Sequence, residues 1–357
     1  MGKKIKVIVI GCGNMGSSHA RAYHKSESFD LTGLVDTNVS NRKKLSEELG
    51  GISQFDDFET ALLTTKPDAA AICTYPETHA PIAIKSLKAG AHVFVEKPLA
   101  VTEEDAREIV KLAQNIGKKL VIGYILRVHP SWKKFIEIAQ TLGKPLVMRM
   151  NLNQQSSGKT WIWHMNLMKS MPPIVDCGVH YVDVMCQMTR SKPVRVSAIG
   201  ARLTDQISAN MYNYGQLSVT FDDGSVGWYE AGWGPMMSET AFFVKDVIGP
   251  NGSVSITDAG SVKEKRSDDI DSHTKTNKLL LHHSEMDKNG AFTRKDEIIS
   301  TEDEPDHQGL CDLEQEFFRD SIINNLDLTS HQEDAINSLR IVLAADLAYR
   351  SGKTVEL

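Results

Sequence analysis

Short apolar runs alternate with longer amphipathic segments over the first third of the chain. The runs are four or five residues long, are rich in small and β-branched side chains, and lie at residues 7–10, 31–35, 69–73, 92–95 and 119–122. A shorter segment at 52–55 is counted as the third strand, so these runs are the first, second, fourth, fifth and sixth. Such runs are typical of strands that are buried on both faces of a parallel sheet. The segments between them have the length of helices, and two of them end at a glycine, Gly90 and Gly117. The alternation predicts a doubly wound α/β domain with a parallel sheet over residues 1–124.

Beyond residue 124 the pattern indicates longer strands joined by turns. We expect helices at 130–142, 175–188, 309–323 and 332–350, an irregular segment at 158–173, and strands at 145–153, 195–201, 216–221, 225–230, 241–247, 254–257 and, as an edge strand, 354–357. Asp222-Asp223-Gly224 between two of these strands is a hairpin signal. Residues 263–301 are charged and polar and are expected to be loosely held. The pattern predicts a second, α+β domain over residues 125–357 with a large, mainly antiparallel sheet.

A glycine-rich turn follows the first apolar run. Gly11, Gly13 and Gly16 have the spacing G-x-G-x-x-G, and residues 14–25 after them have a helical pattern. The first glycine allows a tight turn, the second lets the backbone approach a pyrophosphate, and the third lets the helix pack against the strand. Asp36 ends the second run, where an acid can accept hydrogen bonds from a ribose diol. The motif in this context predicts a dinucleotide-binding site.

Two residues bear on the choice of coenzyme. The carboxylate of Asp36 would repel the 2′-phosphate of NADP, which favours NAD. Arg42 is either a solvated helix residue or a group near the adenine that could help to hold that phosphate. We therefore expect NAD rather than NADP and leave the role of Arg42 open.

Composition and charge exclude several classes of protein. A length of 357 residues is enough for two domains, and 41% hydrophobic residues suffice for a core in each. A net charge of −6 without long charged blocks argues against nucleic acid or a membrane surface as the main partner, and no apolar run is long enough to span a bilayer.

The five cysteines lack a C-x-x-C pair, as in a cytoplasmic protein with reduced thiols. His282-His283 lacks the partner spacing of a metal site, so we expect no metal.

Polar residues follow the predicted strands at one edge of the sheet, where ligands of doubly wound sheets bind. Lys97 comes directly after the fifth strand, and Pro98 restricts its backbone. The alternative is a surface lysine in a strand–helix loop. The sequence does not decide whether the Lys97–Pro98 bond is cis. The other residues at this edge are Cys73, Thr74, Tyr75, Pro76, Glu77, Thr78 and His79 after the fourth strand, Glu96 after the fifth, and Gly123, Tyr124 and Arg127 after the sixth.

In the second domain, Asp176 and His180 are four residues apart in a predicted helix, so their side chains share one face. An acid one turn from a histidine can fix the tautomer and orientation of the imidazole, as a general base requires. An ordinary polar pair has the same spacing, so the pattern alone assigns no role. Trp163 and His164 are candidates for contact with a substrate, with packing inside the segment as the alternative.

Together these motifs resemble the Gfo/Idh/MocA oxidoreductases, a family that includes glucose–fructose oxidoreductase and inositol dehydrogenase. The resemblance rests on GCGNMG with the adjoining His19, on residues 74–79, on Glu96-Lys97-Pro98, on residues 123–127, on D-C-G-V-H at 176–180, and on residues 333–357. It covers nearly the whole chain and is specific for the family rather than for one substrate. It implies an N-terminal Rossmann domain, a C-terminal domain whose open sheet commonly serves in subunit contact, and hence a homo-oligomer, either a dimer or a tetramer.

The resemblance also implies roles for single residues. In the family the equivalents of Lys97, Asp176 and His180 converge over the nicotinamide, so these three are the expected catalytic residues. The expected cofactor-binding residues are Gly11, Gly13, Asn14, Met15, Gly16, Asp36, Thr37, Arg42, Cys73, Thr74, Tyr75, Pro76, His79, Glu96, Lys97 and Arg127. The expected substrate contacts are Lys97, Arg127, Trp163, His164, Asp176 and His180.

We therefore expect an NAD-dependent dehydrogenase that oxidises a secondary hydroxyl of a sugar or cyclitol such as an inositol. His180 would take the hydroxyl proton, Lys97 would stabilise the negative charge that develops on the oxygen, and Asp176 would orient His180 or bind a neighbouring hydroxyl. Three alternatives stay open: an NAD-dependent glycosidase that oxidises its sugar only transiently, a reductase of a keto-sugar or imine, and a regulator that binds sugar and NAD without turnover.

Overall fold

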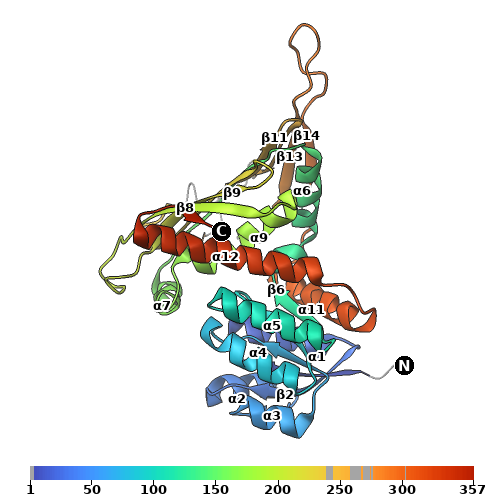
Figure 1. Cartoon of the computed structure of the whole chain (residues 1–357). Coiled ribbons are helices and arrows are strands. Elements are labelled where there is room, and N and C mark those ends of the chain that lie inside the picture. Colours follow the sequence, from blue (N-terminus) through green and yellow to red (C-terminus); the bar gives the residue numbers. More distant parts are fainter. Residues whose placement is uncertain (1–3, 239–243, 258–266, 268–273, 275, 302) are drawn as a thin grey trace. The chain divides into compact units, whose positions relative to one another are not determined.

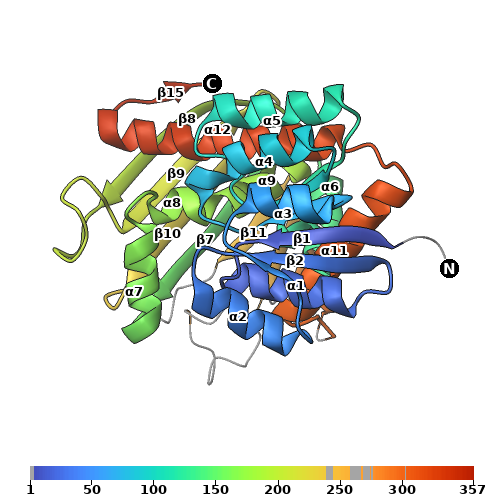
Figure 2. The same ribbon diagram turned by 90° about the horizontal axis from the view of Figure 1, so that it is seen from below.

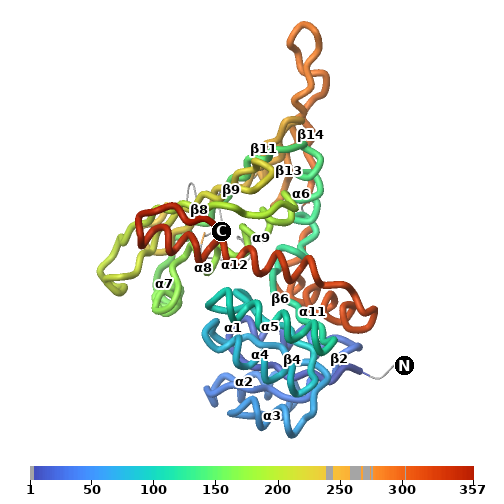
Figure 3. The backbone as a smooth tube through the Cα atoms, viewed as in Figure 1, coloured from blue at the N-terminus to red at the C-terminus, as the bar shows by residue number. Residues whose placement is uncertain are grey.

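The computed structural model describes residues 4–238, 244–257, 267, 274, 276–301 and 303–357. Its chain divides into two compact units, whose paths can be followed by colour in Figure 1 and Figure 3. The first unit comprises Met1–Val128 and Asp306–Ile336, and the second comprises His129–Pro305 and Asn337–Leu357.

The first unit is built on a six-stranded sheet in which every neighbouring pair is parallel. The strand order is β3-β2-β1-β4-β5-β6, so the direction of winding reverses between β1 and β4. The predicted doubly wound parallel sheet is confirmed. The strands are β1 (Ile5–Ile10), β2 (Phe29–Val35), β3 (Gln54–Phe55), β4 (Ala69–Ile72), β5 (His92–Glu96) and β6 (Leu120–Gly123).

Helices cover both faces of this sheet. Right-handed crossovers place α1 and α2 on one face and α3, α4 and α5 on the other, because the chain winds in opposite directions from β1 and from β4 (Figure 2). Two short 3₁₀ helices, η1 (Pro76–Thr78) and η2 (Ile125–Arg127), follow β4 and β6. The helices are α1 (Asn14–Lys25), α2 (Val39–Glu48), α3 (Phe58–Thr65), α4 (His79–Lys88) and α5 (Glu103–Asn115).

The α1 face of the sheet is completed by a helix from near the end of the chain, α11 (His307–Ile323). Phe318 of α11 is fully buried, with its ring centroid 6.4 Å from that of Phe29 and 6.1 Å from that of Phe94. The boundary expected from sequence left residues 306–336 in the second domain, but they pack with the first unit. The reason is that α4 and α5 lie on the opposite face, so the α1 side of β4 to β6 needs another apolar cover.

The second unit contains a nine-stranded sheet in the order β14-β13-β12-β11-β7-β10-β9-β8-β15. Only β7 and β10 pair in parallel among these described strands, so the predicted mainly antiparallel sheet is confirmed. The strands are β7 (Val147–Gln155), β8 (Pro193–Ala201), β9 (Tyr214–Phe221), β10 (Val226–Gly234), β11 (Lys245–Gly249), β12 (Gly252–Thr257), β13 (Lys278–His283), β14 (Glu297–Ser300) and β15 (Val355–Glu356).

Two sequence-based expectations for this sheet are confirmed and one is wrong. Gly224 has φ +83° in the turn between β9 and β10, and β15 lies at the sheet edge. The segment 263–301 was expected to be loosely held, yet its residues 278–283 and 297–300 form paired strands. The polar side chains of this segment pair with one another, because His282 contacts Asp296 and His283 contacts Glu297. Residues 241–243 of the strand expected at 241–247, and residues 263–266, 268–273 and 275 of that segment, lie outside the described residues.

Helices cover one face of the second sheet. The alternation in β7 explains which face, because Met148 and Met150 are buried on the helix side while Val147 and Arg149 are exposed. These helices are α6 (Pro130–Thr141), α7 (Gly158–Leu167), α8 (Pro173–Asp176), α9 (Gly178–Thr189) and the part of α12 (Thr329–Ser351) that belongs to this unit.

Two predictions for the helical part of this unit were wrong, one of an irregular segment and one of a single helix. Residues 158–167 form α7, although the segment 158–173 was expected to be irregular. Trp161, His164 and Met168 have helical spacing and are buried, a periodicity that the analysis of the sequence missed. The helix predicted over 175–188 is two helices, α8 and α9, which meet at Cys177.

We expect Phe318→Ala to lower the free energy of unfolding by about 3–5 kcal/mol, because it removes a fully buried ring that packs between α11 and the sheet residues Phe29 and Phe94. Urea denaturation followed by tryptophan fluorescence measures the change. Ile323→Ala is the control on the same helix, since Ile323 is 61% exposed and its loss should change stability by no more than about 0.5 kcal/mol. Equal shifts for the two variants would show that α11 does not cover the sheet.

Candidate cofactor and substrate sites

The glycine turn between β1 and α1 is held by close backbone contacts. Gly11 has φ +94°, and a Cβ there would lie 2.5 Å from the carbonyl oxygen of Cys73. A Cβ on Gly16 would lie 1.8 Å from the carbonyl oxygen of Gly11. A Cβ on Gly13 would meet nothing within 4 Å, and Gly13 is exposed at the start of α1. Two glycines are therefore required by packing inside the protein, whereas the third leaves open space in front of the helix N-terminus, as a bound pyrophosphate requires.

The carboxylate of Asp36 is bound to the backbone of this turn. Its Oδ2 accepts a hydrogen bond from the N–H of Cys12 at 2.8 Å, and its Oδ1 accepts one from the N–H of Asn38 at 2.7 Å. Arg42 donates to the carbonyl oxygen of Asp36 at 2.6 Å. A carboxylate oxygen can accept more than one hydrogen bond, so Asp36 keeps capacity for a ribose hydroxyl. Burial, and secondarily Asp36, raises the pKa of the Cys12 thiol to about 12, which keeps it neutral.

The loop after β4 is connected to the loop after β5 by a buried histidine. One ring nitrogen of His79 lies 2.8 Å from the carbonyl oxygen of Pro98, and the other lies 3.0 Å from that of Thr74. Burial lowers the pKa of His79. Tyr75 in the same loop is 55% exposed. The structure thus gives His79 a part in fixing both loops and leaves Tyr75 accessible to a ligand.

Lys97 follows β5 and is held by its neighbour Glu96. The Oε1 of Glu96 lies 2.7 Å from Nε2 of His19, and its Oε2 accepts the backbone N–H of Lys97 at 3.2 Å. Burial raises the pKa of Glu96, but the hydrogen bond with His19 and the nearby charge of Lys97 outweigh it, so the pKa is lowered. The Lys97–Pro98 bond is cis. The buried, ionised Glu96 therefore fixes the backbone at the residue for which we predicted catalysis.

The remaining predicted residues of the first unit also follow strand ends. Asn14 and Met15 lie in the first turn of α1, Thr37 is exposed after β2, and Pro76 begins η1. Arg127 pairs with Asp334 of α12 at 2.8 Å, so its guanidinium is already neutralised inside the first unit. The structure brings these residues to the carboxyl edge of the sheet, as the sequence predicted for a ligand site.

In the second unit, Asp176 ends α8 and His180 lies in the first turn of α9. Asp176 is 7% exposed and His180 is half-buried. Between them, a Cβ on Gly178 would lie 3.1 Å from Val342 of α12, which explains why a residue without a side chain is needed there. Asp183 accepts a hydrogen bond from Gln187 at 3.0 Å and is fully buried, so it serves the helix itself.

The two aromatic candidates on α7 differ in exposure. His164 is buried, binds Ser156 at 2.9 Å and stacks on Trp233 with ring centroids 4.4 Å apart. Trp163 is 46% exposed. Of the pair, Trp163 presents a surface to solvent while His164 holds α7 against the sheet.

One buried lysine near Cys177 was not among the residues predicted from the sequence. Lys245 in β11 is 1% exposed, donates to the carbonyl oxygen of Asn151, and lies 4.6 Å from the ring centroid of Tyr181. Burial lowers its pKa well below the usual value. Tyr181 stacks on Tyr229, and the Tyr229 hydroxyl is buried with no hydrogen-bond partner among the described residues. The signal was the position of Lys245 two residues before Val247, which places both side chains on the same side of β11.

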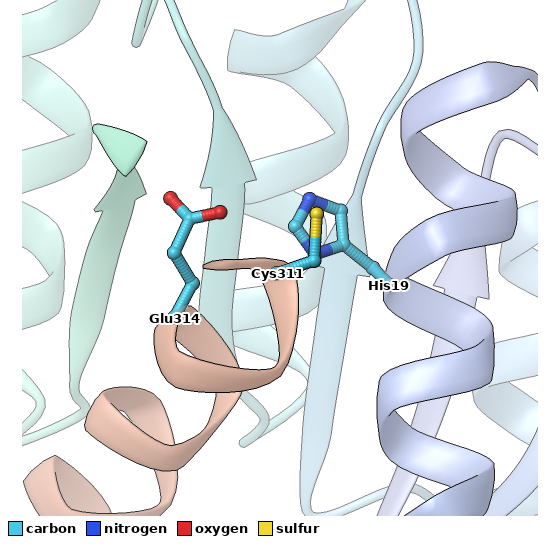
Figure 4. A group of neighbouring side chains, drawn as sticks. All are labelled: His19, Cys311 and Glu314. Carbon is cyan, nitrogen blue, oxygen red and sulfur yellow. The ribbon is translucent and has the colours of Figure 1, made fainter. Parts of the chain in front are cut away.

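Among the described residues, one group of possible metal ligands lies close enough together to hold an ion: His19, Cys311 and Glu314 (Figure 4). No helix among the described residues has the length and apolarity needed to cross a membrane.

Comparison with known proteins gives two family matches. Residues 5–124 match the GFO_IDH_MocA family, described as oxidoreductases with an NAD-binding Rossmann fold, and residues 133–255 match the GFO/IDH/MocA C-terminal domain. D-glucoside 3-dehydrogenase of Escherichia coli K12 is 34% identical over 121 residues, which are 34% of each chain. The scyllo-inositol 2-dehydrogenase (NAD(+)) of Bacillus subtilis 168 is 24% identical over all of this chain and 97% of its own.

Other relatives are matched over part of their length. The chain spans 59% of the UDP-N-acetylglucosamine 3-dehydrogenase of Acidithiobacillus ferrooxidans, at 29% identity over 56% of this chain. A crystal structure of an enzyme of that name from the same species has a TM-score of 0.77 at 22% identity, over 98% of this chain and 99% of that one. That likeness shows the same fold.

We expect Gly13→Ala and Gly16→Ala to separate binding from folding. At Gly16 the methyl group meets backbone, so the variant should lose more than about 3 kcal/mol of stability or fail to fold. At Gly13 the methyl group meets nothing and φ is −73°, so the unfolding temperature should stay unchanged while the affinity for NAD falls about tenfold or more. Thermal unfolding and calorimetric titration with NAD measure the two effects. Unchanged NAD affinity in Gly13→Ala would contradict a pyrophosphate at this turn.

Proposed function

Since this chain belongs to the GFO/IDH/MocA family of oxidoreductases, we propose that it is an NAD-dependent dehydrogenase that oxidises a secondary hydroxyl of a sugar or cyclitol. The observation that carries the proposal is the position of Lys97, directly after β5 and bound through its N–H to the buried Glu96, at the sheet edge that also holds the glycine turn. The names of the D-glucoside and scyllo-inositol dehydrogenases among its relatives favour a ring hydroxyl as the reacting group.

In the proposed reaction, NAD supplies the acceptor for the hydride. The Lys97 ammonium group donates a hydrogen bond to the reacting oxygen and stabilises the negative charge that develops there. The half-buried His180 takes the hydroxyl proton at a ring nitrogen. The buried carboxyl of Asp176, one turn earlier in the chain, orients the imidazole or binds an adjacent hydroxyl of the substrate. The proposal requires Lys97 and His180 to act on the same oxygen.

For the coenzyme we propose NAD over NADP. The Asp36 carboxylate, bound by two backbone N–H groups, is placed to accept the ribose hydroxyls and would repel a 2′-phosphate. Arg42 donates to the Asp36 carbonyl, and this contact supports a role in bracing the turn rather than in holding a phosphate.

On the substrate side, we propose that the exposed Trp163 stacks on the sugar ring and that His164 positions α7 from within the core. Arg127 acts through its pair with Asp334, by holding the loop after β6.

We further propose a cytoplasmic homo-oligomer, a dimer or a tetramer, without nucleic acid or membrane as partner. All five cysteines are free thiols, in keeping with a reducing compartment. On the outer face of the second sheet, Val147 lies opposite both Val226 and Ile248, and all three are exposed. An exposed apolar row of this kind supports subunit contact through the open sheet.

The test is a panel of inositols, aldoses and their glycosides, each with NAD and NADP, read by the absorbance of the reduced coenzyme. We expect net formation of NADH from at least one cyclitol or sugar. Release of an aglycone without net NADH would instead show a glycosidase. NAD binding without turnover on any substrate, in either direction, would indicate a regulator.

In the same assay we expect Lys97→Ala and His180→Ala to lower kcat about 10²–10³-fold, since each removes a group that acts on the developing charge or the proton. NAD affinity, measured by titration, should change by only a few-fold. Lys88→Ala, an exposed lysine on α4, is the matched control and should behave as wild type. If Lys97→Ala binds NAD and its kcat stays within a few-fold of the wild-type value, the role proposed for Lys97 is wrong.

We expect Asp36→Asn to raise the ratio of NADP to NAD efficiency about tenfold, because the substitution removes the repelling charge and keeps one oxygen acceptor for one of the two backbone N–H groups. Values of kcat/KM with each coenzyme measure the ratio. Arg42→Gln is the partner variant and should leave the ratio unchanged if Arg42 only braces the turn. A wild-type enzyme that prefers NADP would contradict the assignment of Asp36.

A further inference from the structure

A cluster of metal-ligand residues lies in the first unit, where α11 packs beside α1. His19 projects from α1, and Cys311 and Glu314 project from α11 (Figure 4). One possible ligand atom from each of the three residues lies within 4.8 Å of the other two. His19 and Cys311 are fully buried, and Glu314 is 3% exposed. The cluster joins segments nearly 300 residues apart, since His19 and Gln315 are 296 positions apart in the chain.

The cluster holds a buried carboxyl group whose hydrogen-bonding capacity is unused. Both carboxylate oxygens of Glu314 are buried without a hydrogen-bond partner among the described residues. A second carboxylate, Glu96, lies 2.7 Å from Nε2 of His19. A dry site with two carboxyl groups and one imidazole needs either an extra proton or a cation.

The chemistry of the donors indicates which cation fits. A thiolate, an imidazole and a carboxylate are the ligands that zinc takes in proteins, and a fourth donor completes its tetrahedron. Cys311 and Glu314 are three residues apart on α11, so both lie on one face of that helix. Nε2 of Gln315 lies 2.8 Å from Nδ1 of His19, and Tyr23 donates to Gln315, so the imidazole orientation is fixed by the groups behind it.

We propose that His19, Cys311 and Glu314 bind a divalent transition metal ion, zinc by its ligand set, with Glu96 as the fourth donor. Binding replaces the hydrogen bond between His19 and Glu96 by bonds from both residues to the ion. As the ion binds, the Cys311 thiol and a protonated Glu314 carboxyl each lose a proton to solvent. The neutral imidazole of His19 binds through Nε2 and keeps its one proton on Nδ1, so the amide of Gln315 turns to accept it with Oε1, and no oxidation or reduction occurs. The ion neutralises the two buried carboxylates and links α1, the end of β5 and α11. It therefore stabilises the attachment of residues 306–336 to the parallel sheet.

The test uses the full chain, purified without a metal-affinity step after growth with added zinc, and its metal content is measured by mass spectrometry. We expect about one zinc per chain. Cys311→Ser and Glu314→Gln should each lower the zinc content about tenfold or more. Cys186→Ser is the matched control, since Cys186 is a buried free thiol of the second unit and should leave the zinc content unchanged.

Cobalt provides a readout on the unmodified chain, which guards against variants that fail to fold. After chelation, addition of Co²⁺ to wild type should produce the absorption of a tetrahedral cobalt site with a thiolate charge-transfer band. Zinc added to the chelated chain should raise its unfolding temperature.

The proposal is overturned if the wild type holds no zinc and shows no cobalt–thiolate band, or if Cys311→Ser retains its metal. In the first case, Glu314→Gln of unchanged or raised stability would identify Glu314 as a protonated carboxyl. None of these readouts depends on turnover, so they test the metal site independently of the proposed dehydrogenase activity.

Discussion

The need to compensate a carboxylate buried at the end of β5 organises much of the first unit. Glu96 is 6% exposed and stays ionised because His19 and the N–H of Lys97 both bind it. His19 ties it to α1, the helix that opens at the glycine turn, and Gln315 ties His19 to α11. One desolvated charge thus connects the strand edge, the predicted catalytic lysine, and a helix from near the end of the chain. Loss of such a charge partner leaves an unpaired buried ion, which is costly.

In the second unit, several polar groups are buried on the helix side of the nine-stranded sheet. Lys245 of β11 and Tyr229 of β10 lie there against Tyr181 of α9, and Asp176 is buried at the end of α8. Lys245 and Tyr229 are inside because their side chains point to the helix side of their strands. Burying such polar groups costs free energy, and buried groups with shifted pKa values are more frequent at functional sites than elsewhere.

Sequence reasoning succeeded where a local pattern has one structural solution. The runs at 7–10 and 92–95 are short, apolar and β-branched, and both are central strands. The glycine motif predicted the turn that Gly11 and Gly16 make. It failed at α7, because an expectation of irregular structure overrode the helical spacing of Trp161, His164 and Met168. The roles assigned to Lys97, His180 and the residues around them stay predictions, because a cofactor and substrate decide them.

By itself the sequence determined the parallel sheet, the glycine turn with its acid, the hairpin at residues 222–224 and the family, because each depends on neighbours in the chain. Only the tertiary structure decided that residues 306–336 complete the first unit and that His164 stacks on Trp233. It also brought Cys311 and Glu314 against His19. Contacts between residues almost 300 positions apart depend on which face of the sheet the crossovers leave open, and no local periodicity carries that information.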